Sequence, residues 1–334
     1  MIRASGISKW YGPVRALHNV SFEIPRGQIV GLLGPNGAGK TTTIRIATGF
    51  LPPTSGSLSI NGHDTVEDSI AARRCIGYLP DTAPLYPEMG VRAYLDYRGR
   101  LYGLARQARR AAAERVIDRC ALGPVRDRRI GQLSKGYRQR VGLAAAMLHD
   151  PPVLILDEPV SGLDPGQILE VRTLIRELSE DRTVLVSSHI LSEVELTCDR
   201  VIIIAAGTIR ADGTPEDLLD ALRADAPYVA EVRAGDLAGE EVASILRATP
   251  GVAGVMVSPV ADAPGYVRCL VTPNRGAGDL REPLAAALAG VGGGGLLVRE
   301  LRRERPTLEQ FFLTVTGEGA QAQGAGAAVA EAAA

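Results

Sequence analysis

The segment Gly34–Thr41, with the sequence Gly-Pro-Asn-Gly-Ala-Gly-Lys-Thr, constrains the fold of this chain more than any other feature. It follows an apolar run, Gln28–Leu33, and precedes a stretch with helical spacing, Lys40–Phe50. The spacing G-x-x-x-x-G-K-[ST] between a strand and a helix is typical of a phosphate-binding loop. Glycines let consecutive backbone N–H groups face phosphate oxygens, and the helix adds its positive N-terminal end. We therefore predict an α/β fold with a phosphate site at this loop.

Each residue of this loop has an expected task in holding a nucleotide. Lys40 is placed for the β- and γ-phosphates, and the Thr41 hydroxyl for a Mg²⁺ ion. The candidate nucleotide-binding residues are Gly34, Pro35, Asn36, Gly37, Ala38, Gly39, Lys40, Thr41 and Thr42.

A second motif, Val153–Pro159, is a short apolar strand that ends in two acids. Its apolar residues indicate a strand buried on both faces of a parallel sheet. A carboxylate at the end of such a strand lies beside the phosphate loop, where Asp157 would hold Mg²⁺ directly or through water. Glu158 would orient and deprotonate an attacking water. The two motifs together predict a site for phosphoryl chemistry.

Composition excludes several other classes of protein. The 334 residues are 46% apolar and 22% charged, which is ordinary for a globular chain. Lys+Arg is 37 and Asp+Glu is 38, so the basic surplus of a dedicated nucleic-acid-binding protein is missing, and we expect no nucleic-acid partner. The four cysteines form no Cys-x-x-Cys pair, which favours a reduced, cytoplasmic compartment. The N-terminal residues show no apolar core of a signal peptide.

The order of strands and helices suggests two folded parts. Short apolar runs at Val153–Leu156, Thr183–Ser187 and Val201–Ala205 alternate with helical stretches, which predicts a mostly parallel α/β sheet. After a change near Asp220–Pro227, the expected order is strand, helix, strand, strand, helix, strand, a ferredoxin-like α+β unit. We therefore predict a first domain over 1–220, a ferredoxin-like accessory domain over 221–318 and a disordered Ala/Gly-rich tail over 319–334.

Five motifs in the first part occur in a family's order and spacing. They are the phosphate loop, Leu133-Ser134-Lys135-Gly136-Tyr137, Leu154–Pro159, Ser161-Gly162-Leu163-Asp164 and Ser188-His189. The chain thereby resembles the ATP-binding cassettes of ABC transporters over residues 1–220. It looks most similar to the single-cassette ATPases of the drug-export and gliding-motility branch, which serve separate ABC-2-type permeases. This resemblance implies a P-loop NTPase fold, namely a RecA-like core with an antiparallel β subdomain and a helical insert at about 82–150.

The resemblance also implies roles for further residues. Tyr11 is similar to the aromatic residue that stacks on adenine, and His189 to the switch histidine that contacts the γ-phosphate. Ser134, Lys135, Gly136 and Tyr137 match the signature loop, which faces the nucleotide of a second subunit, and Asp164 matches an acid that crosses the dimer interface. Glu158 and His189 are therefore the expected catalytic residues, and Thr41, Asp157 and Asp81 the expected Mg²⁺ residues.

Three positions depart from the family's pattern. Lys135 stands where the signature usually has Gly, and Tyr137 where it has Gln. The charge of Lys135 either supports a nearby phosphate or lies in solvent. Asp81 stands where Gln usually follows the strand Ile76–Leu79; its carboxylate can still accept from a Mg²⁺-bound water, so we expect altered metal affinity.

Five of the nine tyrosines lie between residues 78 and 102, at and within the start of the expected helical insert. The group comprises Tyr78, Tyr86, Tyr94, Tyr97 and Tyr102, with Leu85 and Met89 among them. Aromatic residues and Met are enriched at protein interfaces, and in the family this insert binds the membrane subunit. Ordinary core packing of a helical subdomain explains the same pattern, so both interpretations stay open.

The expected function is that of an ATP-binding and ATP-hydrolysing subunit, with ATP and Mg²⁺, that powers export through a separate ABC-2-type permease. The resemblance implies a homodimer in the ATP state and a peripheral, cytoplasmic position on the inner membrane through the permease. One alternative is a soluble ABC protein that uses ATP-driven dimerisation as a switch without transport. Another is a binding protein with an inactive site, against which Lys40, Asp157, Glu158 and His189 argue.

Overall fold

The computed structural model describes residues 1–334 apart from 224–225, 235–236, 261, 292–295, 305 and 317–334. The chain divides into two compact units, one of Met1–Pro215 with the segment from Phe312, the other of Glu216–Phe311. Helices α8 (Pro215–Arg223) and α11 (Leu308–Thr316) each cross a limit between these units. The predicted tail over 319–334 lies outside the described residues.

The first unit contains the predicted parallel sheet. Its strand order is β10-β9-β3-β8-β7-β6, in which only β10 is antiparallel to its neighbour. The strands are β3 (Ile29–Leu33), β6 (Ile76–Leu79), β7 (Val153–Asp157), β8 (Thr183–Ser188), β9 (Arg200–Ala205) and β10 (Thr208–Gly213). Strand β3 is buried along its whole length, as expected for a central strand that is covered on both faces.

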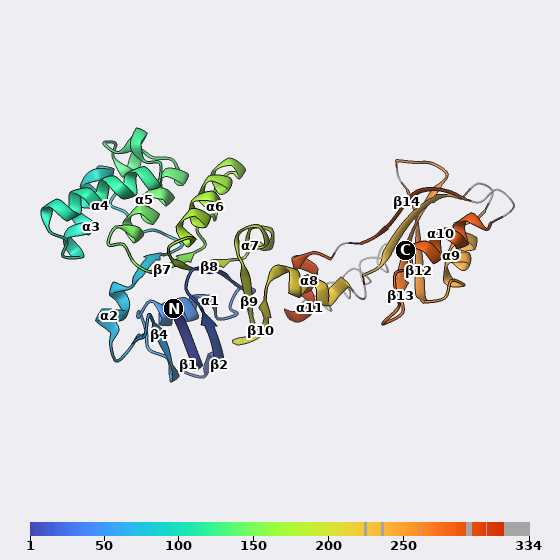
Figure 1. Ribbon diagram of the computed structural model, residues 1–334, viewed down its shortest axis with the longest axis horizontal. Coiled ribbons are helices and arrows are strands. Elements are labelled where there is room, and N and C mark those ends of the chain that lie inside the picture. Colours follow the sequence, from blue (N-terminus) through green and yellow to red (C-terminus); the bar gives the residue numbers. More distant parts are fainter. Residues whose placement is uncertain (224–225, 235–236, 261, 292–295, 305, 317–334) are drawn as a thin grey trace. The chain divides into compact units, whose positions relative to one another are not determined.

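A second, antiparallel sheet packs against the first around helix α1 (Lys40–Ala47) (Figure 1). Its order is β2-β1-β4-β5, with β1 (Ile2–Tyr11), β2 (Val14–Ile24), β4 (Ser55–Ile60) and β5 (His63–Asp64). One buried cluster joins side chains of both sheets to those of α1, such as Ile7, Leu32 and Ile44. This core fixes α1 directly behind the phosphate loop.

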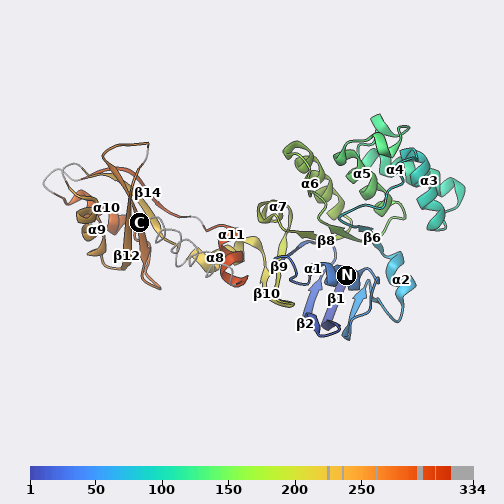
Figure 2. The ribbon, with the colours of Figure 1, turned by 180° about the vertical axis from the view of Figure 1, so that it is seen from behind.

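Among the helices of the first unit, α3, α4 and α5 form a separate group (Figures 1 and 2). The remaining helices are α2 (Ser69–Arg74), α3 (Val91–Leu101), α4 (Arg106–Arg119), α5 (Lys135–Met147), α6 (Pro165–Ser179) and α7 (Leu191–Thr197), with short 3₁₀ turns η1 (Gly123–Val125) and η2 (Ile130–Gln132). In the described part of the chain, no helix is both long and apolar enough to cross a lipid bilayer.

Two predicted helical stretches differ in length from the observed helices. The stretch Lys40–Phe50 ends as a helix at Ala47, since Gly49 has a φ of 70° and turns the chain out of the helix. The stretch 92–122, which its Ala, Leu and Arg content and helical spacing predict as helical, is two helices, α3 and α4. They are separated by a turn in which Gly103 has a φ of 75°. Apolar periodicity predicted both regions but not these glycine turns.

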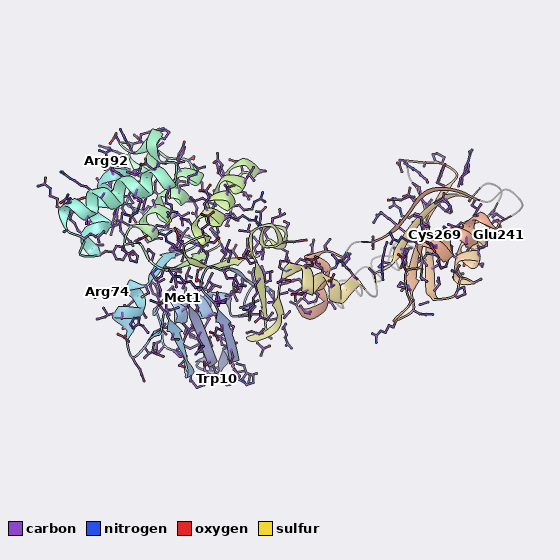
Figure 3. All side chains as sticks on the ribbon, viewed as in Figure 1. Met1, Trp10, Arg74, Arg92, Glu241 and Cys269 are labelled. Atoms are coloured by element: carbon purple, nitrogen blue, oxygen red, sulfur yellow. The ribbon has the colours of Figure 1, made fainter. Side chains whose placement is uncertain are left out.

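The second unit has the predicted βαββαβ order. Its elements are β11 (Tyr228–Arg233), α9 (Gly239–Arg247), β12 (Val252–Pro259), β13 (Tyr266–Pro273), α10 (Arg281–Ala289) and β14 (Leu297–Arg303). The antiparallel sheet has the order β12-β13-β11-β14, so the two central strands are the first and third of this unit. This is the topology of a ferredoxin-like unit. Its core includes Cys269, which Figure 3 labels, with Leu246 and Leu284 from the two helices.

Candidate active site

A cavity of about 510 Å³ collects residues from four separate parts of the first unit. The phosphate loop and α1 contribute Asn36, Lys40, Thr41 and Arg45, and β6 with the residues after it contributes Tyr78, Pro80, Asp81 and Thr82. The others lie at the end of β7 or follow β7 and β8. Seven predicted site residues line this cavity, namely Asn36, Lys40, Thr41, Asp81, Asp157, Glu158 and His189. Because the parallel strands β6, β7 and β8 end at the same sheet edge, their carboxyl ends bring these side chains together.

The phosphate loop has the conformation that its glycines permit. Gly37 and Gly39 have φ angles of 78° and 111°, values that residues with a Cβ rarely adopt. The Lys40 ammonium folds back over this loop and donates to the carbonyl oxygens of Gly34 at 2.5 Å and Pro35 at 3.1 Å. Partial burial lowers the pKa of Lys40, and the charges of Glu158 and Asp157 oppose that shift. The ammonium is thus a partly desolvated cation at the mouth of the loop.

Asp157 and Glu158 are held by strand β8. Ser187 donates its hydroxyl to Asp157 Oδ1 at 2.5 Å, and the Glu158 backbone N–H donates to Ser187 Oγ at 3.1 Å. The same N–H lies 3.2 Å from the Ser187 carbonyl oxygen. Ser187 is fully buried, so the ends of β7 and β8 are locked together.

Glu158 and His189 form a pair inside the cavity. His189 Nδ1 lies 2.8 Å from Glu158 Oε2, within hydrogen-bonding distance. The Glu158 side chain is 17% exposed and that of His189 57% exposed, so the carboxylate lies deeper than the imidazole. A carboxylate at this depth, paired with a histidine, can accept a proton from a water molecule above it.

Several residues of this region were not predicted as site residues. Ser187 links the two strands that carry the acids, and Arg45 and Ser161 line the cavity. The sequence holds only a partial signal for Ser187, since it ends an apolar run, and the pairing of that run with β7 is seen only in the structure. Tyr78 also lines the cavity, and burial together with the Asp157 charge raises its pKa to about 12, which keeps its hydroxyl protonated.

The other predicted site residues lie outside this cavity. Ser134 and Asp164 begin helices: Ser134 Oγ accepts from the Tyr137 N–H at 3.3 Å, and Asp164 Oδ1 from the Gln167 N–H at 2.9 Å. Gly136 is tightly packed, since a Cβ there would lie 2.7 Å from Gln167. Tyr11 is 44% exposed on β1, with the Lys9 ammonium 5.6 Å from its ring centroid.

The Lys135 ammonium lies against Gly162, where it would clash with any Cβ. The side chain is exposed, and it connects the start of α5 with the segment Ser161–Asp164. Its charge is therefore positioned beside two of the predicted dimer segments.

A phosphate loop before α1, a paired Asp-Glu after β7 and a histidine after β8 define a P-loop nucleoside triphosphatase. The family profile described as ABC transporter matches residues 17–161. The chain is 35% identical over 318 residues to the daunorubicin resistance ATP-binding protein DrrA3 of Streptomyces coeruleorubidus. The matched region covers 95% of this chain and 96% of that relative. It is 40% identical over 214 residues to the ABC transporter ATP-binding protein NatA of Bacillus subtilis (strain 168), covering 64% of this chain and 87% of that protein.

Solved structures with the same fold are ABC cassettes. An ATP-binding subunit of an ABC transporter superimposes with a TM-score of 0.61 at 32% identity, over 66% of this chain and 93% of that one. A dimeric ATP-binding cassette in a post-hydrolysis state with ADP and Pi gives a TM-score of 0.58 at 25% identity. That match covers 64% of this chain and 98% of the cassette. The chain belongs to the ATP-binding proteins of ABC transporters, and its enzymatic activity is ATP hydrolysis. The predicted fold class is confirmed.

Proposed function

We propose that this chain hydrolyses Mg·ATP at the cavity described above and thereby drives export through a separate ABC-2-type permease. The observation that carries the proposal is the convergence of Lys40, Asp157, Glu158 and His189 on one cavity. Relatives named for drug resistance support export as the direction of transport. We further propose that the chain works at the cytoplasmic face of the membrane, where the permease would hold it.

In this proposal, each residue of the chain has one task. The backbone N–H groups of the loop Gly34–Gly39 and the Lys40 ammonium bind the β- and γ-phosphates. Glu158 accepts a proton from the attacking water. His189, which pairs with Glu158 Oε2, orients that carboxylate and contacts the γ-phosphate. Tyr11 would stack on the adenine, because its ring is exposed at the end of β1.

The oxygen atoms in the cavity suit a Mg²⁺ ion. Thr41, Asp81 and Asp157 supply a hydroxyl and two carboxylates, all hard donors. The described residues contain no group of three or more His, Cys, Asp or Glu that could hold a metal ion alone. That fits Mg²⁺, which is usually bound by one or two carboxylates together with waters and substrate phosphates. Such an ion would neutralise charge on the β- and γ-phosphates.

We propose that a second copy of the chain completes the site. Ser134, Gly136 and Asp164 lie at the starts of α5 and α6, and none of them lines the cavity of its own chain. A helix start favours an anion, so the start of α5 suits the γ-phosphate bound by the other copy. Lys135 would add a positive charge there, and Tyr137 would replace the usual Gln contact.

A groove beside the cavity is the proposed docking surface for the permease. It has a volume of about 330 Å³ and lies between α3, α5 and the segment that follows β6. Tyr78 and Pro80 line both the groove and the nucleotide cavity, so one segment connects the two. Of the tyrosine group, Tyr78, Tyr94 and Tyr102 line the groove, whereas Tyr86 is 44% exposed and contacts Tyr94 and Tyr97 edge to face.

Co-purification of the tagged chain with its membrane subunit, followed by ATPase measurement with and without that subunit, tests the proposal. Phe50→Ala removes an aromatic ring that is 72% exposed at the groove, and it should weaken association by about tenfold or more. Leu196→Ala is the matched control, since Leu196 is 53% exposed but lies outside the groove. A chain that hydrolyses ATP but associates with no membrane protein would favour the alternative of a switch protein without transport.

A further inference from the structure

Arg98 is an unneutralised cation inside the groove that we propose as the permease dock. The following inference rests on that proposed function. Arg98 projects from α3, where it lines the groove together with Tyr94 and Tyr102. The groove walls are otherwise mostly apolar, with Leu79, Ala83 and Leu85 among them.

The contacts of Arg98 are weak for a guanidinium group. Its Nη2 donates to the Tyr102 hydroxyl at 3.4 Å, and its Cζ lies 5.7 Å from the centroid of the same ring. Its Nε is buried without a hydrogen-bond partner. Among the residues that the structure describes, no carboxylate forms an ion pair with Arg98. Arg98 is therefore a half-buried cation that lines the groove without a carboxylate partner, and at least its Nε lacks a hydrogen bond.

The neighbouring side chains do not supply the missing negative charge. The second cation of the groove is Arg73, which donates to the backbone oxygen of Ser69 at 3.1 Å and to its hydroxyl at 3.3 Å. No Asp or Glu belongs to the described residues that line the groove. His149, which stacks on Tyr102 with 3.9 Å between ring centroids, is kept neutral at pH 7 because burial lowers its pKa to about 4. The groove thus combines apolar walls with two positive charges and no negative one.

We propose that the membrane subunit docks an amphipathic helix whose apolar face carries one Asp or Glu, and that this carboxylate pairs with Arg98. An apolar helix face fits walls of this kind. A docked helix would exclude water from Arg98, and a buried charge without a partner is strongly unfavourable. A carboxylate can accept from the planar guanidinium fork in a bidentate manner, which would neutralise the Arg98 charge. Arg98 is then a specificity-determining residue, since a helix without an acid would leave its charge buried and unpaired.

The test uses the full-length chain co-expressed with the membrane subunit that co-purifies with it. Arg98→Glu should lower the recovered membrane subunit at least tenfold. The basal ATP hydrolysis and melting temperature of the soluble variant should equal those of the wild type, because Arg98 lines the groove and not the nucleotide cavity. Arg74→Glu is the matched charge reversal: Arg74 is exposed on α2 (Figure 3) outside the groove, so association should stay at the wild-type level.

A compensating change in the partner identifies the acid. Each Asp and Glu in the cytoplasmic loops of the membrane subunit is replaced by Arg, one at a time, and tested with both chains. One replacement should restore association with Arg98→Glu at least tenfold while weakening association with the wild-type chain. Should Arg98→Glu alter the fold, Arg98→Gln serves in its place and should also weaken association, since it removes the charge with less change of shape.

Three outcomes would overturn the pairing. One is wild-type association of Arg98→Glu, and another is a loss that no acid-to-Arg replacement restores. In both cases, if Phe50→Ala still weakens association with the membrane subunit, the groove remains the docking surface and only the pairing of Arg98 is refuted. The third is wild-type association of both Arg98→Glu and Phe50→Ala, which would show that the proposed docking surface itself is wrong.

Discussion

Glu158 has a φ of 51°, a left-handed backbone conformation that residues other than glycine rarely adopt. The two hydrogen bonds from its N–H to Ser187 hold the chain in this conformation. Strain of this kind persists only where neighbouring groups over-determine it, and it concentrates at functional sites. The turn after β7 thereby aims the Glu158 carboxylate into the cavity beside His189.

Replacing Glu158 by Gln should lower the turnover of ATP by about 10²–10⁴-fold, the usual contribution of a positioned general base. ATP binding should remain, because the phosphate loop is unchanged. Steady-state hydrolysis and equilibrium binding of a fluorescent ATP analogue separate the two effects. Lys40→Ala is the comparison: it removes the cation that faces the phosphates and should weaken binding itself. Equal loss of binding in both variants would refute these roles.

His149 predicts a pH dependence of stability. Burial lowers its pKa in the folded protein to about 4, whereas an exposed histidine has a pKa near its ordinary value of 6.5. The unfolded state therefore binds a proton that the folded state resists, so the free energy of unfolding should fall as the pH drops from about 6.5 to about 4. The loss attributable to His149 is about 3 kcal/mol at most. Urea unfolding at several pH values checks this.

The matched variant for this pH dependence is His149→Phe. It keeps an aromatic ring against Tyr102 but has no titratable nitrogen, so its unfolding free energy should change less between pH 6.5 and 4 than that of the wild type. If the unfolding free energies of the two proteins change equally with pH, His149 is not held neutral by burial.

At the scale of elements, glycines mark where segments approach most closely. A Cβ at Gly77 in β6 would lie 2.6 Å from Leu154 Cδ2 and 2.8 Å from Pro151 Cγ, and against the Ala146 carbonyl oxygen in α5. Gly77→Ala should therefore destabilise the protein by about 1–3 kcal/mol through overpacking. A melting curve measures this, with Gly123→Ala as control because nothing lies within 4 Å of a Cβ there. Unchanged stability of Gly77→Ala would show that β6 and α5 can separate at no cost.

Most elements could be predicted because their signals are local. The buried run of β7 and the loop before α1 depend on neighbouring residues in the sequence, and the βαββαβ order follows from alternation of apolar residues. Contacts between distant segments were not predictable. The hydroxyl of Ser187 reaches Asp157 only because β8 pairs with β7, and the isolation of Arg98 depends on side chains from several elements.

At the scale of the whole molecule, the ferredoxin-like unit has a core of its own and no predicted site residue. We expect it to stabilise the dimer or to regulate it. Ending the chain at residue 220 should therefore shorten the lifetime of the ATP-bound dimer, whereas removing 319–334 should change nothing measurable. Stopped-flow fluorescence measures the dissociation rate of the dimer for both truncated chains. An unchanged rate for the chain that ends at residue 220 would exclude this role.

The central claim is that two copies of this chain form the ATP site together. Sedimentation velocity of the Glu158→Gln protein with saturating Mg·ATP tests it most directly, because this variant should bind ATP without hydrolysing it. We predict a dimer with Mg·ATP and a monomer without nucleotide. A Ser134→Arg change in the same background should prevent the dimer, since a bulky cation would replace the small cap at the start of α5. A monomer for Glu158→Gln at saturating Mg·ATP would contradict the account.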